Sequence, residues 1–102
     1  MVELRRFQRT PIDEDVNIVD TKTGVKGRGR ARDICLGGMF IETRVVFPFG
    51  ASVTVELRTP EGTMLLPGVV RWNRTDGMGV QFGLIGAKET HIITEMTRVE
   101  EE

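Results

Sequence analysis

The sequence has few of the residues on which most enzyme and metal sites depend. It contains one cysteine, Cys35, and one histidine, His91, in 102 residues. One cysteine excludes an internal disulfide, and this pair is too small a ligand set for a closed structural zinc site. We expect His91 to pack or be exposed on a helix, and nothing in the sequence places a base beside Cys35 to activate it. The glycine-rich loops of common nucleotide enzymes are also missing, so we predict no enzyme, no metal and no cofactor.

Long apolar segments are absent as well. The opening residues, MVELRRFQR, lack the apolar stretch of a secretory signal, and no run approaches the roughly 18 apolar residues of a membrane-spanning helix. We therefore expect a cytoplasmic protein without membrane insertion. Since a domain usually needs roughly 100–200 residues, the whole of 1–102 is expected to form one domain.

An excess of positive charge is missing, and this argues against a protein that binds nucleic acid polymers. Fourteen basic and 15 acidic residues give a net charge of -1, whereas duplex-DNA binders usually carry a clear basic excess. The arginines are nevertheless grouped, which favours attraction of a small dianion over a long polyanion. One group is Arg5, Arg6 and Arg9, and a second is Lys26, Arg28, Arg30 and Arg32.

Most of the chain has the two-residue alternation of β-strands. In residues 27–35 the alternation places Arg30 and Arg32 on one face and Ala31, Asp33 and Cys35 on the other. Pro67 indicates a bulge or a sheet edge at its position. Strands are expected near 16–19 and over 27–35, 39–43, 53–58, 65–74 and 78–82, with turns at 22–24, 47–50, 60–62 and 75–77.

The last fifth of the chain is different, because Ile92, Ile93, Met96 and Val99 recur at helical spacing. The pattern predicts an all-β fold with a C-terminal helix, in which six short antiparallel strands close into a barrel so that no edge is exposed. We expect a flexible Arg-rich lead-in over 1–11, the barrel over 12–84 and the helix over 86–99.

One group of residues has the chemistry to bind a guanine nucleotide. Asp33 and Cys35 project from the same strand face, and Gly38 lets a ligand approach the backbone. A carboxylate accepts from the N1–H and exocyclic amine of guanine, while arginine donates to O6 and N7 or pairs with phosphate. The spacing alone is common, so it does not establish a site.

The order of these pieces resembles the PilZ domain family. An Arg-x-x-x-Arg segment, Arg5 to Arg9, is followed after about 25 residues by Asp-x-Cys-x-x-Gly, which continues as Met-Phe-Ile-Glu-Thr. The family has Ser at the position of the Cys. Gly68–Arg74 and Gly79–Phe82 are similar to later strands of the family, and the resemblance covers residues 4–98. It implies a six-stranded antiparallel barrel that binds the bacterial second messenger cyclic di-GMP. The implied ligand residues are Arg5, Arg6, Arg9, Asp33, Cys35 and Gly38.

The resemblance implies a receptor that signals to an effector protein when the ligand orders its N-terminal Arg segment. The thiol of Cys35 is a weaker hydrogen-bonding group than the family hydroxyl, so an alternative is a motility- or pilus-type adaptor that has lost the ligand. A third possibility is a small-barrel RNA or single-strand binder, although such barrels usually expose several aromatic side chains and this chain has only six. Trp72 is either a platform for a base or a packing residue.

Overall fold

Six β-strands and one helix follow one another in the computed structural model, which describes residues 9–60 and 62–98. The six strands alternate in direction, and each hairpin closes at one of the predicted turns or beside Gly37. The elements are β1 (Thr10–Asp20), β2 (Lys26–Cys35), β3 (Gly38–Thr43), β4 (Ser52–Thr59), β5 (Gly62–Arg74), β6 (Gly77–Phe82) and α1 (Ala87–Met96).

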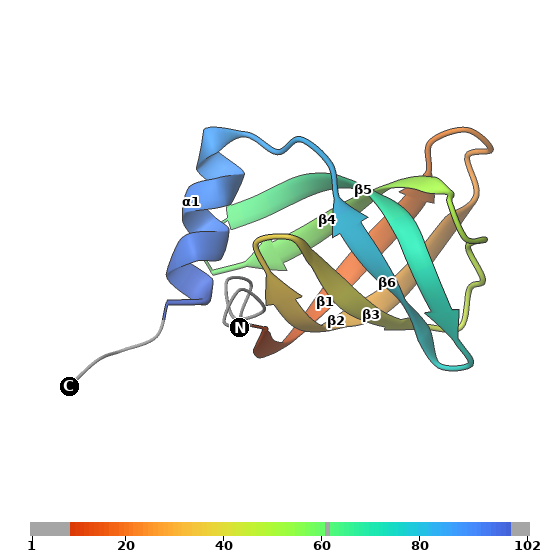
Figure 1. Cartoon of the computed structure of the whole chain (residues 1–102), viewed down its shortest axis with the longest axis horizontal. Helices are drawn as coiled ribbons and strands as arrows, with labels where there is room; N and C mark the ends of the chain where they lie inside the picture. Colours follow the sequence, from red (N-terminus) through yellow and green to blue (C-terminus); the bar gives the residue numbers. More distant parts are fainter. Residues whose placement is uncertain (1–8, 61, 99–102) are drawn as a thin grey trace, which may run out of the picture.

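The strands form a closed barrel in the order β1-β2-β3-β6-β5-β4 (Figure 1). Every neighbouring pair is antiparallel, including β1 with β4, whose pairing from Val16↔Leu57 to Asp20↔Val53 closes the barrel. Closure gives every strand a neighbour on both sides, which is the reason for expecting a barrel from so many short strands. The predicted fold class is therefore confirmed.

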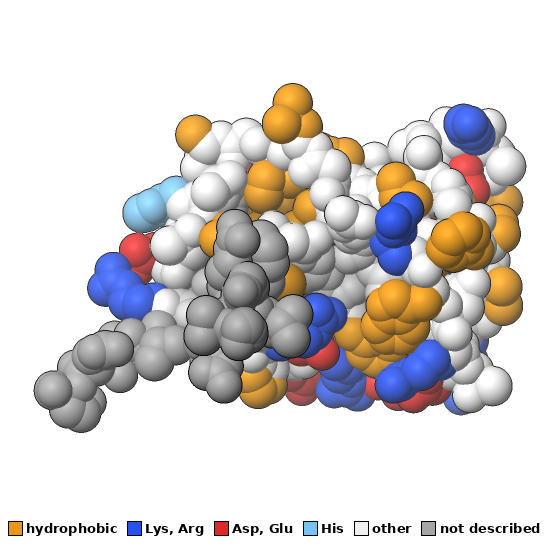
Figure 2. All heavy atoms as spheres, in the orientation of Figure 1, with side chains coloured by type: hydrophobic (Ala, Val, Ile, Leu, Met, Phe, Trp, Pro, Cys, Tyr) orange, Lys and Arg blue, Asp and Glu red, His pale blue; other side chains and the backbone are white. Residues whose placement is uncertain are grey.

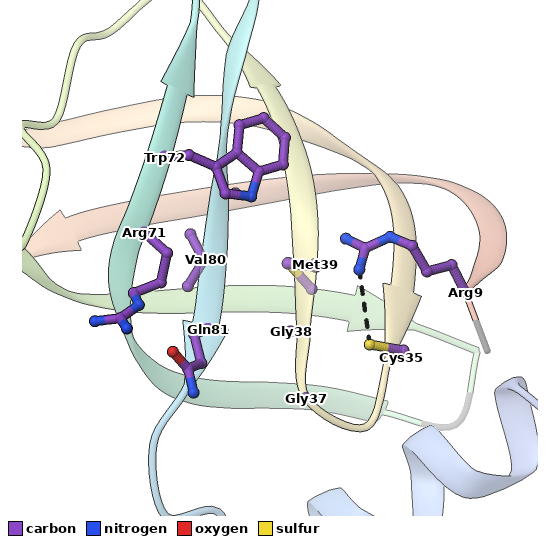
Figure 3. Close-up of a pocket in the computed structure, with 10 residues that line it drawn as sticks. Arg9, Cys35, Gly37, Gly38, Met39, Arg71, Trp72, Val80 and Gln81 are labelled. Atoms are coloured by element: carbon purple, nitrogen blue, oxygen red, sulfur yellow. Dashed lines mark hydrogen bonds between the residues drawn. The ribbon is translucent and has the colours of Figure 1, made fainter. Parts of the chain in front are cut away.

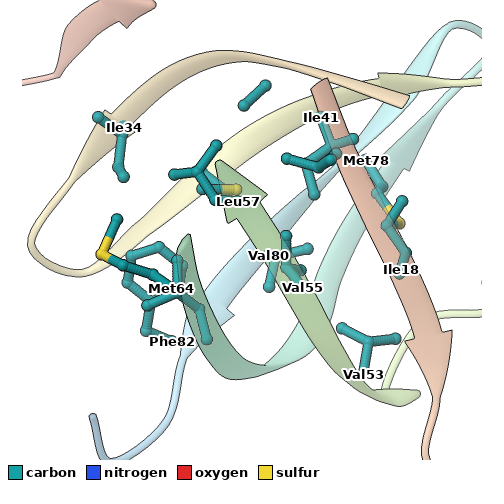
Figure 4. Packing of buried hydrophobic residues seen from close by; sticks show 14 of the residues in the cluster. Ile18, Ile34, Ile41, Val53, Val55, Leu57, Met64, Met78, Val80 and Phe82 are labelled. Carbon is teal, nitrogen blue, oxygen red and sulfur yellow. The ribbon is translucent and has the colours of Figure 1, made fainter. Parts of the chain in front are cut away.

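The core fills the barrel with the inward-facing residues of all six strands (Figure 4). Alternate residues such as Val53, Val55 and Leu57 of β4 are almost completely buried, as the two-residue period of a strand requires. Helix α1 lies across one end of the barrel (Figure 1), and its Ile92 and Ile93 belong to the same core cluster. Met96 packs against that cluster, so the helical spacing was a reliable sign of its buried face.

The first strand and the C-terminal helix have slightly different boundaries in the structure than the sequence predicted. Strand β1 begins at Thr10, inside the segment 1–11 that we expected to be a lead-in. Helix α1 ends at Met96, where Thr97 caps it by donating its backbone N–H to Ile93 O at 2.9 Å. Val99, together with Arg5 and Arg6, lies outside the described residues.

A bulge in β2 changes which residues share a face. Ala31 pairs with Ile41 and Asp33 pairs with Phe40, so Arg32 is an extra residue on β2. The simple alternation predicted that Ala31, Asp33 and Cys35 face the same way, and for Ala31 this is wrong. Ala31 is in the core, whereas Asp33 comes after the extra residue and lies on the outer face.

A second bulge lies in β5, at Arg71 and not at Pro67. Val70 pairs with Val80 while Trp72 pairs with Gly79, which makes Arg71 the extra residue. At Pro67 the pairing with β4 is regular, so there is no bulge. The β5–β6 ladder ends at Gly68, so Pro67 pairs with a strand on one side only, and a local sheet edge tolerates the proline as predicted. The carbonyl of Pro67 accepts a hydrogen bond from the backbone N–H of Gly83.

Among residues 9–60 and 62–98, no helix is both long and apolar enough to cross a membrane.

Candidate functional site

A pocket of about 360 Å³ opens on the outer face of the barrel where β2 and β3 lie beside β6 and β5 (Figure 3). One side is formed by Arg9 before β1 and by the β2–β3 hairpin, which contributes Cys35, Gly37, Gly38 and Met39. The other side is formed by Arg71, Trp72, Gly79, Val80 and Gln81 of β5 and β6. This volume is within the range of about 300–1,000 Å³ typical of small-molecule sites.

Arg9 and Cys35 line this pocket, and Arg9 contacts both Cys35 and Asp33. Arg9 donates from Nε to Asp33 Oδ1 at 3.1 Å, and its Nη2 lies 2.9 Å from the same oxygen. Its Nη1 donates to Cys35 Sγ at 3.9 Å (Figure 3), a weak hydrogen bond. Asp33 and Cys35 therefore share a face, as their spacing predicts, and a residue from before β1 reaches both of them.

The Cys35 side chain is buried, although it does not belong to the core cluster. It lies on the outer side of β2, beneath the Arg9 guanidinium. The side chains of Arg9 and Asp33 are 47% and 29% exposed. A ligand can therefore reach the guanidinium and the carboxylate directly, and meets the thiol only at the floor of the pocket.

Gly38 is required by the packing of the barrel strands. A Cβ at this position would overlap the carbonyl oxygen of Val80 on the neighbouring strand β6. The backbone of Gly38 forms part of the pocket floor. The glycine thus allows β3 and β6 to approach closely and leaves the floor without a side chain.

Trp72 forms the upper wall of the pocket in Figure 3 and is part of an aromatic stack. Its ring lies 5.5 Å from that of Phe40, with an angle of 9° between the planes. Gly79 of β6 lies beneath the indole, and a Cβ there would overlap it. The guanidinium of Arg74 lies 4.8 Å from the centre of the Phe40 ring. Trp72 is 40% exposed, so it is both a packing residue and an accessible aromatic surface.

The second basic group predicted from the sequence does not meet the first at the pocket. Arg30 pairs with Asp13 and Asp15, and Arg32 pairs with Asp13 and Glu42. These carboxylates neutralise the two arginines, and the hydrogen bond that Arg30 donates to Asp13 also raises the pKa of Arg30. None of the described residues that line the pocket comes from this group.

The positive charge across the pocket from Arg9 comes from Arg71, which sequence reasoning did not select. Gln81 lies on the same side of the pocket, as Figure 3 shows. A regular strand would point Arg71 and Trp72 to opposite faces, but the β5 bulge leaves both on the outer face. The run Gly68–Arg74 contained no signal for this register change.

Comparison with known proteins agrees with the fold. The model of the PilZ domain family matches residues 3–98. A search of curated proteins found no match.

Solved structures with the same fold include three described as follows. The Bacillus subtilis inhibitor of motility MotI/DgrA has a TM-score of 0.73 and 22% identity, over 89% of this chain and 48% of that one. This chain therefore spans about half of that relative's length. The PilZ domain of CeSA from a cellulose-synthesizing bacterium has a TM-score of 0.72 and 12% identity, over 87% and 94% of the two chains. The PilZ domain of YcgR from Escherichia coli, with c-di-GMP, has a TM-score of 0.69 and 15% identity, over 92% of each chain.

Proposed function

Since this chain belongs to the PilZ domain family, we propose that it is a non-catalytic receptor for cyclic di-GMP that signals to a protein partner. One observation carries the proposal. Arg9, Asp33 and Gly38 match the family's ligand motifs, and Cys35 stands at the position of the family's serine. Arg9, Cys35 and Gly38 line one outer-face pocket and Asp33 binds Arg9 beside it, although Gly38 comes 29 positions after Arg9 in the chain. The solved YcgR domain of the same fold holds c-di-GMP.

The proposed contacts follow from the donors and acceptors present. Asp33 accepts hydrogen bonds from the N1–H and exocyclic amine of one guanine, and Arg9 donates to O6 and N7 of a base or to a phosphate oxygen. Both contacts of Arg9 with Asp33 go to Oδ1. No hydrogen bond or ion pair among the described residues is made by Oδ2 of Asp33, so guanine can bind this oxygen before Arg9 moves.

The proposed signal is a change in the segment before β1. Arg5 and Arg6 join the site when the dianionic ligand attracts the N-terminal Arg segment to the barrel. Arg9 is already paired with Asp33 on the barrel. Ordering of the N-terminal Arg segment can therefore begin at Arg9. The effector protein then binds a surface that differs between the free and bound forms.

A second candidate is the ligand-free adaptor, and Cys35 is the observation that favours it. The thiol stands where the family has a serine, at the floor of the pocket. Loss of one neutral hydrogen bond costs on the order of 1 kcal/mol, or roughly fivefold in affinity. A loss of this size weakens binding but does not abolish it, and for this reason we favour the receptor.

Isothermal titration calorimetry of the wild type and Asp33→Ala with cyclic di-GMP tests the proposal. Hydrogen bonds to a charged group contribute about 1.5–3 kcal/mol, so Asp33→Ala should bind roughly 10- to 150-fold more weakly. Asp15→Ala is a matched control, because it removes a carboxylate that pairs with Arg30 outside the pocket. Absence of binding by the wild type would favour the adaptor, and equal binding by Asp33→Ala would show that the site is elsewhere.

A further inference from the structure

Arg71 and Gln81 have no role in the function proposed above, although they form one side of its pocket. They come from neighbouring strands: Gln81 pairs with Val69 on β5, two residues before Arg71. In Figure 3 both side chains lie on the side of the pocket opposite Arg9 and Cys35. The floor between the two sides is formed by Gly38, Met39 and Val80.

The side chains of Arg71 and Gln81 are free to bind a ligand. Both residues are exposed, and neither makes a side-chain hydrogen bond or ion pair with another of the described residues. By contrast, Arg30, Arg32 and Arg74 are paired with carboxylates. None of the described pocket-lining residues is acidic, so no carboxylate in the lining competes for the Arg71 guanidinium.

The two sides of the pocket offer similar chemistry. On one side Arg9 supplies donors, and Asp33, which binds Arg9 beside the pocket lining, supplies an acceptor. On the other side Arg71 supplies donors, and Gln81 supplies an amide oxygen that accepts and an amide nitrogen that donates. Each side thus combines a guanidinium with an acceptor, which is the combination that guanine satisfies with O6 and N7 on one edge and N1–H and N2–H on another. Cyclic di-GMP carries two identical guanines.

We propose that Arg71 and Gln81 recognise the second guanine of the ligand. This inference rests on the proposed function, and it explains how the receptor would be specific for a ligand with two guanines. Arg71 donates to O6 and N7 of the second base, and the Gln81 amide oxygen accepts from its N1–H or exocyclic amine. Adenine has an N6–H donor in place of the O6 acceptor, so the Arg71 donors would meet a donor. The pocket should therefore discriminate against a cyclic dinucleotide with one guanine and one adenine.

The experiment compares cyclic di-GMP with 3′,3′-cyclic GMP-AMP in calorimetric titrations of the full chain. In the wild type, the mixed dinucleotide should bind about tenfold more weakly, because one good bidentate contact to a base commonly gives discrimination of this size. In Arg71→Ala and in Gln81→Ala the difference between the two ligands should shrink to about threefold or less. Thermal unfolding of each variant checks its fold, which should be intact because both side chains are exposed.

Arg58→Ala is the matched control. Arg58 is an exposed arginine on β4 that does not line this pocket, so its removal changes the net charge equally and should leave the discrimination unchanged. Equal weakening of both ligands by Arg71→Ala would assign Arg71 to a phosphate and overturn base recognition. Unchanged affinity for cyclic di-GMP would also overturn the inference, and in both cases the proposed function stands. If the wild type does not bind cyclic di-GMP, both proposals are wrong.

Discussion

Cys35 is the single residue at which this site departs from the family motif. Its side chain lies outside the core cluster and contacts the Arg9 guanidinium. A hydroxyl in its place would donate and accept more strongly than the thiol and would occupy less space. We therefore expect Cys35→Ser to bind cyclic di-GMP about fivefold more tightly than the wild type, as measured by calorimetry.

Cys35→Ala separates the effect of the hydroxyl from the effect of a smaller side chain. It removes the sulfur without adding a hydrogen-bonding group, so its affinity should be at or slightly below that of the wild type. If Cys35→Ala tightens binding as much as Cys35→Ser does, the gain comes from space in the pocket floor. If Cys35→Ser binds more weakly than the wild type, the thiol itself contributes to the site.

At the level of strands, the sequence predicts where strands and the helix lie better than it predicts which side chains face the core and which face outward. The positions of the later strands, the order of turns and the buried side of α1 follow from local periodicity and turn residues, and these agree with the structure. The first strand was expected near 16–19, but β1 already begins at Thr10. The two bulges do not follow from periodicity, because each adds one residue whose position depends on the partner strand. Asp33 was identified by its motif, whereas Arg71 belongs to no motif and was missed.

The site also depends on contacts between strands that are distant in sequence. Gly79 is an ordinary strand residue in sequence, yet the absence of its Cβ lets Trp72 lie over β6 and stack on Phe40. The pairing Phe40↔Gly79↔Trp72 across β3, β6 and β5 sets this arrangement. Sequence reasoning left Trp72 open between ligand contact and packing, and only the strand register shows that its position allows both.

The β1–β2 hairpin carries the clearest pH-sensitive contact in the described part of the chain. Asp20 is buried, and its Oδ1 accepts hydrogen bonds from the backbone N–H groups of Thr23 at 3.0 Å and Lys22 at 2.8 Å. These donors, Thr23 first, hold the pKa of the Asp20 carboxyl below its ordinary value. The turn also requires Gly24 at a φ of 79°, a conformation that glycine adopts readily.

A lowered pKa makes the contribution of Asp20 to stability depend on pH. The contribution is fully present above the unfolded-state pKa of about 3.9 and is lost as the pH falls through the lower folded-state value. Asp20→Asn keeps an oxygen acceptor but has no charge, so it should lower the Tm at pH 7. Its Tm should approach that of the wild type as the pH falls below the lowered folded-state pKa of Asp20. Thermal unfolding at several pH values measures this, and a difference that does not change with pH would contradict it.

The whole barrel separates its charges so that a near-neutral molecule presents a basic pocket. Asp13, Asp15 and Glu42 are paired with Arg30 and Arg32. The pocket is lined by Arg9, which is paired with Asp33 beside it, and by Arg71, which is paired with no carboxylate among the described residues. Figure 2 shows one face of the molecule, on which hydrophobic side chains lie beside Lys and Arg side chains. The net charge of -1 therefore says little about the charge that a ligand meets.

The pocket exists only in the folded barrel, and this predicts a large effect of the ligand on stability. Arg9, Asp33, Arg71 and Gln81 come from four segments that the strand pairing brings together, so the unfolded chain offers no equivalent site. A ligand that binds only the folded state at 100 times its Kd stabilises it by about 2.7 kcal/mol. For a domain of this size, that corresponds to a rise in Tm of roughly 10–20 °C.

Thermal unfolding with cyclic di-GMP at a concentration set from the calorimetric Kd measures this rise. Asp33→Ala at the same ligand concentration should gain only a small part of it, because its Kd is expected to be much higher. The wild type has an Arg-rich segment that can attract a dianion without the barrel, and such binding would persist in the unfolded chain. Calorimetric binding without a rise in Tm would therefore assign the ligand to that segment alone. It would contradict a site built from the barrel face, since only the assembled pocket can link ligand binding to the stability of all six strands.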